Sequence, residues 1–77
     1  MKSNIVHQYF KKEIGEVKII VKVDPIHLKG TELTVFKDGR AETRNLQFDE
    51  EIMEDLKVDG FEACSAIEFN LYLAGLA

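Results

Sequence analysis

The amino-acid sequence predicts a small α+β domain with two layers. A mainly antiparallel four-stranded sheet carries two helices, in the chain order α-β-β-β-α-β. Three observations lead to this fold class. Residues 16–24 alternate apolar and polar side chains, as a half-buried strand does. Asp38-Gly39, a pair favoured in tight hairpin turns, stands between two segments with strand character. Residues 48–60 place apolar residues at helical spacing and end at a glycine.

Length and composition indicate one domain, residues 1–77. A chain of 77 residues is too short to divide its apolar surface between two cores, and a hydrophobic content of 45% argues against disorder. The single cysteine excludes an internal disulfide and favours a reducing, cytoplasmic location. The N-terminal residues lack the apolar core of a signal peptide, and charges recur too often for a membrane span.

The first predicted element is a short helix over residues 3–14. Ser3 can cap it by accepting a backbone N–H, and Lys11 and Lys12 suit the negative end of the helix dipole. Gly15 can end the helix in a left-handed conformation. The apolar side of this helix comprises Ile5, Val6, Tyr9 and Phe10.

The second predicted element is a strand with the sequence EVKIIVKVD, residues 16–24. Its positions at a spacing of two divide into two faces. One face carries Val17, Ile19, Val21 and Val23, and the other carries Lys18, Ile20 and Lys22. Pro25 ends the strand because proline has no N–H to donate to a neighbour.

Residues 31–48 are expected to form a hairpin with Asp38-Gly39 as a two-residue loop. A type I′ turn at this loop pairs Phe36 with Ala41. In that register one face of the hairpin holds the apolar residues that join the core, namely Leu33, Val35, Leu46 and Phe48. The opposite face then holds Thr34, Phe36, Ala41 and Thr43.

The stretch FDEEIMEDLKVDG, residues 48–60, predicts the second helix. Asp49 can cap its N-terminus, while Phe48 and Met53 occupy the positions of a hydrophobic staple. The expected buried stripe is Ile52, Met53 and Leu56. The pair Asp59-Gly60 ends the helix.

Residues 61–73 fit either a helix or a strand. Their apolar residues scatter around a helical wheel, whereas a period of two aligns Ile67, Phe69, Leu71 and Leu73 on one face. We therefore expect a strand. The C-terminal LYLAGLA makes this an apolar edge that favours pairing with another chain.

The order of the first five predicted elements resembles that of double-stranded-RNA-binding domains. Those domains carry a lysine-rich motif at the start of their second helix. Here the same place holds DEEIMED, which removes the family's main phosphate contacts. The resemblance is therefore one of element order, and it does not imply RNA binding.

The acids of the second helix form one candidate surface. Residues 1–44 carry a net charge of +3 and residues 45–77 carry −7. Glu50 and Glu54 share a helix face, as do Glu51 and Asp55, and such pairs can hold a hard cation. The alternative is a solvated face with acids at the favourable end of the helix dipole. We expect no metal, and we expect this surface to receive a basic partner if one exists.

No residues point to catalysis. His7 and His27 lie on different elements without companion ligands, although a metal site needs about three or four. Cys64 has no base or glycine turn beside it, so it is expected to be a small packing residue. The sequence thus predicts no catalytic residue, metal or cofactor, and we expect that the protein is not an enzyme.

The sheet face turned away from the helices is the second candidate surface. Its expected interface residues are Lys18, Ile20, Lys22, Phe36 and Tyr72. Exposed apolar residues favour contact with a second copy. Cations beside aromatic rings could instead bind single-stranded nucleic acid, with Lys37, Arg40 and Arg44 contributing. A third alternative is an antiparallel face that is simply exposed to water.

These observations favour a small non-catalytic protein-interaction module that self-associates, as a homodimer or another homo-oligomer, through the open face or the apolar last strand. The alternative is a nucleic-acid-binding accessory protein that uses the basic, aromatic-bearing face. The overall charge of −4 disfavours nucleic acid, because such proteins usually carry a basic stripe.

Overall fold

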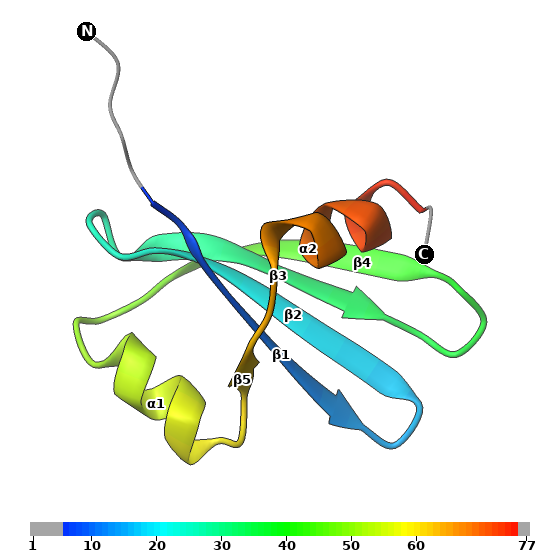
Figure 1. The fold of residues 1–77 in the computed structure, drawn as a ribbon, viewed down its shortest axis with the longest axis horizontal. Coiled ribbons are helices and arrows are strands. Elements are labelled where there is room, and N and C mark those ends of the chain that lie inside the picture. Colours follow the sequence, from blue (N-terminus) through cyan, green and yellow to red (C-terminus); the bar gives the residue numbers. More distant parts are fainter. Residues whose placement is uncertain (1–5, 76–77) are drawn as a thin grey trace, which may run out of the picture.

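The computed structural model describes residues 6–75, which form a five-stranded antiparallel sheet with one helix on each face (Figure 1). The elements in chain order are β1 (Gln8–Ile14), β2 (Val17–Asp24), β3 (Lys29–Val35), β4 (Ala41–Gln47), α1 (Ile52–Val58), β5 (Glu62–Ala63) and α2 (Ala66–Leu73). The strand order across the sheet is β4-β3-β2-β1-β5. The α+β class and the antiparallel sheet are confirmed. The expected four strands, the chain order and the two-layer arrangement are wrong.

The helices lie on opposite faces because β2 is apolar on both of its sides. Successive residues of a strand point to opposite faces. Val21 and Val23 pack with Leu56 of α1, whereas Ile20 packs with Phe69 of α2. The predicted division of β2 into two faces is therefore confirmed, as is its end before Pro25. The second face, however, is a second core and not an open surface.

The expected N-terminal helix is a strand, β1. It pairs with β2 in a register that places Phe10 opposite Val21, and a two-residue loop joins the two strands. Gly15 opens this loop with a φ of 62°, a conformation that glycine adopts without strain and that suits a two-residue hairpin. The proposed cap Ser3 and the apolar Ile5 lie outside the described residues. With β1 in place of a helix, the likeness in element order to double-stranded-RNA-binding domains is lost.

The hairpin of β3 and β4 forms around Asp38-Gly39, but its register differs by one residue from the prediction. Val35 pairs with Ala41, and the Phe36 N–H donates a 2.8 Å hydrogen bond to the Arg40 carbonyl. The loop therefore has three residues, with Gly39 at a φ of 89°. A shift of one residue moves side chains to the other face of one strand relative to its partner. Leu33 consequently packs towards α2, while Phe48 packs on the α1 side.

Helix α1 forms where the sequence predicts it and contributes Ile52, Met53 and Leu56 to the first core cluster. Asp49 does not cap it directly, because the helix begins after Glu51. The Asp49 carboxylate instead accepts a 3.0 Å hydrogen bond from the Glu51 N–H and shapes the turn that precedes the helix.

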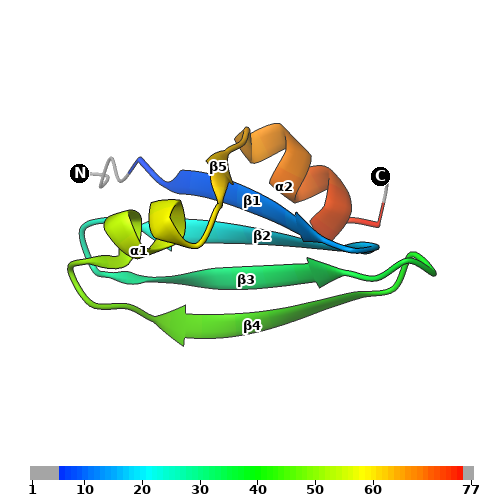
Figure 2. The same cartoon turned by 90° about the horizontal axis from the view of Figure 1, so that it is seen from below.

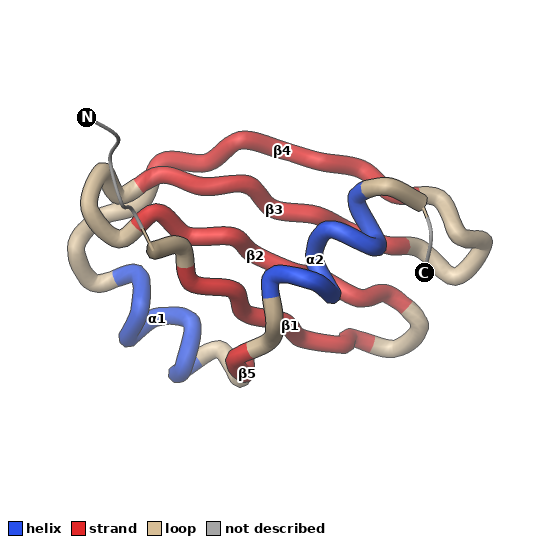
Figure 3. The backbone as a smooth tube through the Cα atoms, turned by 45° about the horizontal axis from the view of Figure 1, so that its top comes forward, coloured by secondary structure: helices blue, strands red, loops and turns tan. Residues whose placement is uncertain are grey.

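The prediction of a strand over residues 61–73 is wrong. Only β5 is extended, and α2 follows it as a helix that crosses the strands on the other face (Figure 3). Ser65 caps α2, since its hydroxyl accepts a 3.1 Å hydrogen bond from the Glu68 N–H. Phe69 is only 2% exposed, whereas Ile67 is 71% exposed, so these two residues do not share a face.

Candidate interaction surfaces

The sheet face expected to be open is covered by α2. Ile20 has no exposed surface and packs against Phe69, so the prediction that it lies on an open sheet face is wrong. Tyr72 belongs to the covering helix and packs against the same cluster. Phe36 lies at the hairpin tip, where the Arg40 guanidinium stands 4.6 Å from its ring centre. Lys22 is half-buried. The predicted interface residues thus do not form one continuous surface.

Lys18 and Tyr72 contact each other. The Lys18 Nζ donates a 2.7 Å hydrogen bond to the Tyr72 hydroxyl and lies 4.7 Å from the centre of its ring. This hydrogen bond raises the pKa of Lys18 above its ordinary value. The two residues therefore attach the end of α2 to β2, and neither is free for a partner in this arrangement.

A second polar contact attaches the start of α2 to β1. The Lys11 Nζ lies 3.0 Å from one carboxylate oxygen of Glu68 and 3.1 Å from the other. The hydrogen bond to Glu68 raises the pKa of Lys11. Because Ser65 and Glu68 stand three residues apart, the sequence carries the Ser-x-x-Glu spacing typical of a helix N-terminus. This spacing could have predicted α2 from the sequence. The contact of Glu68 with Lys11 was not predicted.

The acidic residues of α1 and of the turn before it lie on the surface as expected. Glu50, Glu51, Glu54 and Asp55 are all exposed. Among residues 6–75, no group of three or more His, Cys, Asp or Glu side chains is placed to hold a metal ion. The binding of a basic partner to this surface stays a prediction.

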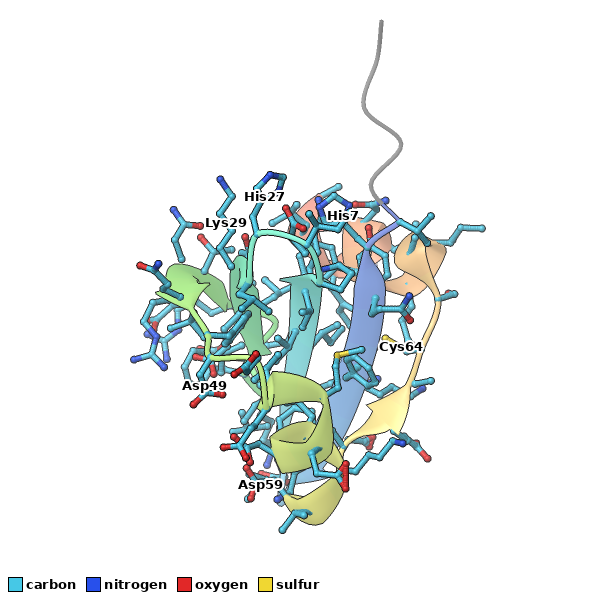
Figure 4. All side chains as sticks on the ribbon, turned by 90° about the vertical axis from the view of Figure 1, so that its left-hand side faces the viewer. His7, His27, Lys29, Asp49, Asp59 and Cys64 are labelled. Carbon is cyan, nitrogen blue, oxygen red and sulfur yellow. The ribbon has the colours of Figure 1, made fainter. Side chains whose placement is uncertain are left out.

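One end of the sheet has an open hollow of about 620 Å³ beside His7, Lys22 and Lys29. Figure 4 shows His7, His27 and Lys29 at this end of the sheet, with Cys64 apart from them. Asp24, which also lines the hollow, is buried and accepts 3.0 Å hydrogen bonds from the backbone N–H groups of Ile26 and His27. The His27 backbone N–H foremost, then the His27 side chain, whose Nδ1 lies 2.9 Å from the other carboxylate oxygen, and the Ile26 N–H lower the pKa of Asp24 to about 2. Asp24 therefore acts here as a structural anchor for the turn after β2.

Cys64 joins the second core cluster, as the sequence suggested for a packing residue. Its backbone N–H donates a 2.9 Å hydrogen bond to the Tyr9 carbonyl, and its side chain is half-buried. Burial raises the pKa of the Cys64 thiol above its ordinary value. A nucleophilic cysteine needs the opposite shift, because the thiolate is the reactive form.

The three cations near the tip and along the outer strand of the β3–β4 hairpin each have an acidic neighbour. Lys37 pairs with Glu16 at 3.2 Å, Arg40 with Asp38 at 3.6 Å, and Arg44 with Glu32 at 2.9 Å. These pairs neutralise the cations that were considered for nucleic-acid binding. Among the described residues, the tip of this hairpin and β4 therefore offer no run of unpaired cations.

The outer side of α2 is apolar and exposed. Ile67, Leu71 and Leu73 are 71%, 41% and 50% exposed. These residues belong to the segment that the sequence marked for self-association, although its backbone is helical. The segment thus exposes apolar side chains, as expected, but it does so from a helix and not from a strand at the sheet edge.

The open edge of the sheet is β4. It is the outermost strand, and Figure 2 shows it on the free side of the sheet, away from both helices. Six of its seven residues are exposed, and no proline or glycine interrupts them. Among residues 6–75, no strand pairs with its outer side.

Two hydrogen bonds define which backbone groups of β4 are free. The Arg40 carbonyl accepts from Phe36, and the Phe48 N–H donates to the Leu28 carbonyl at 2.7 Å, so both residues turn towards β3. Alternate residues of an antiparallel strand direct both backbone groups to the same neighbour. The intervening residues therefore present their N–H and C=O groups to the outside. These residues are Ala41, Thr43, Asn45 and Gln47.

The chain matches no protein-family model, and neither the search of curated proteins nor that of solved structures gives a match. Within residues 6–75, none of the helices has the length and apolar character needed to cross a membrane. The fold of residues 6–75 is that of a small α+β domain in which β4 is a long, open edge strand.

Proposed function

We propose that the protein is a small non-catalytic interaction module that self-associates by adding a strand to the open edge of β4. The observation that carries this proposal is the row of outward backbone groups along β4. Unpaired N–H and C=O groups at a sheet edge form a template for another extended chain. A single uninterrupted strand of this length provides several such hydrogen bonds.

Two further features support the edge as the binding surface. The sheet face that the sequence predicted to be open is occupied by α2, and Ile20 and Phe69 are buried there. Natural proteins commonly shield an edge with charged side chains, a proline, a bulge or a covering element, and β4 carries the charges of Glu42 and Arg44. The described part of β4 has neither a proline within it nor a helix over its outer side.

The test measures the mass of the full chain in solution by light scattering coupled to gel filtration, over a wide range of protein concentration. We expect a species of twice the 8.8 kDa chain mass at high concentration. A monomer at every concentration would overturn the proposed function.

The variant Thr43→Pro tests the edge itself. Proline removes the N–H that points outward at residue 43, and it is tolerated on edge strands whose N–H faces solvent. We expect a monomer with an unchanged circular dichroism spectrum. The matched control Thr43→Val keeps the N–H and the β-branched side chain, and it should remain a dimer. A dimer that survives Thr43→Pro contradicts the edge as the contact.

A further inference from the structure

The charged side chains of β4 are complementary to those of a second β4 strand that runs antiparallel to it. Glu42 and Arg44 flank Thr43 and point to the same face of the sheet, the face that carries α1. Arg44 pairs with Glu32 of β3, yet its side chain is still 67% exposed. Among the described residues, no cation lies within ion-pair distance of Glu42. The edge therefore presents one carboxylate and one guanidinium, two residues apart.

We propose that two copies of the chain join β4 to β4 in antiparallel orientation, about a two-fold axis at Thr43. This inference rests on the proposed function, and it specifies the partner and the register. Thr43 then pairs with Thr43 of the second copy, and Ala41 pairs with Asn45 of the second copy. These residues carry the outward backbone groups, so the three pairs exchange about six hydrogen bonds.

In this register Glu42 of each copy faces Arg44 of the other. The two ion pairs occupy the non-hydrogen-bonded positions, where facing side chains approach most closely. Arg44 is then flanked by Glu32 of its own sheet and Glu42 of the second copy. The charges alternate in a row across the junction, and every contact occurs twice, as two-fold symmetry requires.

Neighbouring registers lose this complementarity. A two-fold axis at Glu42 sets two carboxylates opposite each other, and an axis at Arg44 does the same with two guanidinium groups, which is unfavourable for directly facing residues. An axis at Ala41 places Glu42 opposite Arg40. That register, however, pairs β4 with the turn at residues 37–39 and leaves Asn45 without a strand partner. The axis at Thr43 alone combines opposite charges with full use of the strand.

The resulting dimer has a continuous ten-stranded sheet, two copies of the five strands of one chain. The helices do not obstruct this junction, because α1 and α2 pack against strands β1 to β3 on either face. The junction joins edges and leaves both core clusters intact.

A charge exchange between two variants tests the register. The first variant carries Glu42→Lys and the second carries Arg44→Glu. Both also carry Glu32→Gln, so that the second variant has no like-charge pair between β3 and β4. When either variant pairs with itself, both contacts between positions 42 and 44 bring like charges together. We expect dimerisation of each to weaken by about tenfold or more.

A one-to-one mixture of the two variants should restore the dimer. The lysine introduced at position 42 of the first variant then faces the carboxylate introduced at position 44 of the second, and the native Arg44 of the first faces the native Glu42 of the second. Masses are measured by sedimentation equilibrium on the full chains, with Glu32→Gln alone as the reference. Variants that dimerise as well as this reference, or a mixture that stays monomeric, would overturn the register. A monomeric wild type would instead overturn the proposed function itself.

The outer side of α2 provides the matched control. Ile67→Glu combined with Leu71→Glu removes the exposed apolar surface of the helix and leaves β4 unchanged. We expect this variant to keep the wild-type dissociation constant. Loss of the dimer in this variant would place the contact on α2 and contradict the junction at β4.

Discussion

The Lys18 Nζ donates a 2.7 Å hydrogen bond to the Tyr72 hydroxyl, and this bond joins β2 to the end of α2. Lys11 and Glu68 make the corresponding contact at the start of the helix. Phe69 lies between the two contacts and fills the core below. Helix α2 is therefore held by one buried aromatic ring with a polar contact at each end.

Tyr72→Phe should lower the free energy of unfolding by about 1 kcal/mol, because it removes the hydrogen bond and leaves the ring in place. The measurement is urea denaturation at one fixed protein concentration, so that self-association contributes equally to every sample. Asn70→Ala is the control, since Asn70 is exposed on the same helix. Equal losses in the two variants would show that the Lys18 contact does not stabilise α2.

Phe69→Ala should cost about 3–5 kcal/mol, because it removes the largest fully buried side chain and leaves a cavity. The milder Phe69→Leu keeps the site apolar and should give a smaller loss if the alanine variant does not fold. Ile67→Ala, two residues away but exposed, should change stability by about 0.5 kcal/mol or less. A comparable loss from Ile67→Ala would mean that its side chain is covered in solution.

Asp24 should make stability depend on pH in acid. Its pKa is lowered from 3.8 to about 2 by the His27 backbone N–H, the His27 side chain and the Ile26 backbone N–H, so its contribution is full above about pH 4 and is lost as the pH falls towards 2. We expect Asp24→Asn to be less stable than the wild type at neutral pH and to approach it near pH 2. Thermal denaturation over this range measures the difference. Asp55→Asn, at an exposed position on α1, should change neutral-pH stability little.

Cys64 should react slowly with a thiol reagent in the folded protein. Burial raises the pKa of its thiol, so less thiolate is present at neutral pH, and the packed surroundings restrict access. We expect a rate several-fold lower in the native chain than in the chain unfolded in urea, followed with a chromogenic disulfide. Equal rates would contradict the packing role of Cys64 and favour an accessible, reactive thiol.

The sequence correctly predicted those elements whose apolar residues fit only one type of secondary structure. In residues 16–24 apolar residues recur at every second position from Val17 to Val23, and the division of β2 into two faces is confirmed, although the face of Ile20 is covered and not open. Helix α1 was recognised because its apolar stripe follows the helical period. The fold class and the antiparallel sheet followed from these two elements together with the Asp38-Gly39 hairpin.

The wrong assignments of helix and strand arose where the apolar residues fit both the helical period and the strand period of two. Tyr9 and Phe10 can share one side of a helix, but in β1 they enter opposite core clusters. Phe69 and Ile67 align at a period of two, yet Phe69 alone is buried, because Ser65 caps a helix that turns Ile67 outward. The open edge was misplaced for this reason: strand order depends on tertiary pairing, and β4 gives no local sign that it is outermost.

The connections of the sheet also bear on how the chain folds. Strands β1, β2 and β3 each pair with the next strand along the chain across short loops, whereas Lys11 and Glu68 are 57 residues apart in sequence. Local contacts close early because their loops lose little entropy. We therefore expect the four-stranded meander to dominate the folding transition state and α2 to dock afterwards. Glu68→Gln should then accelerate unfolding while leaving the refolding rate almost unchanged in stopped-flow measurements.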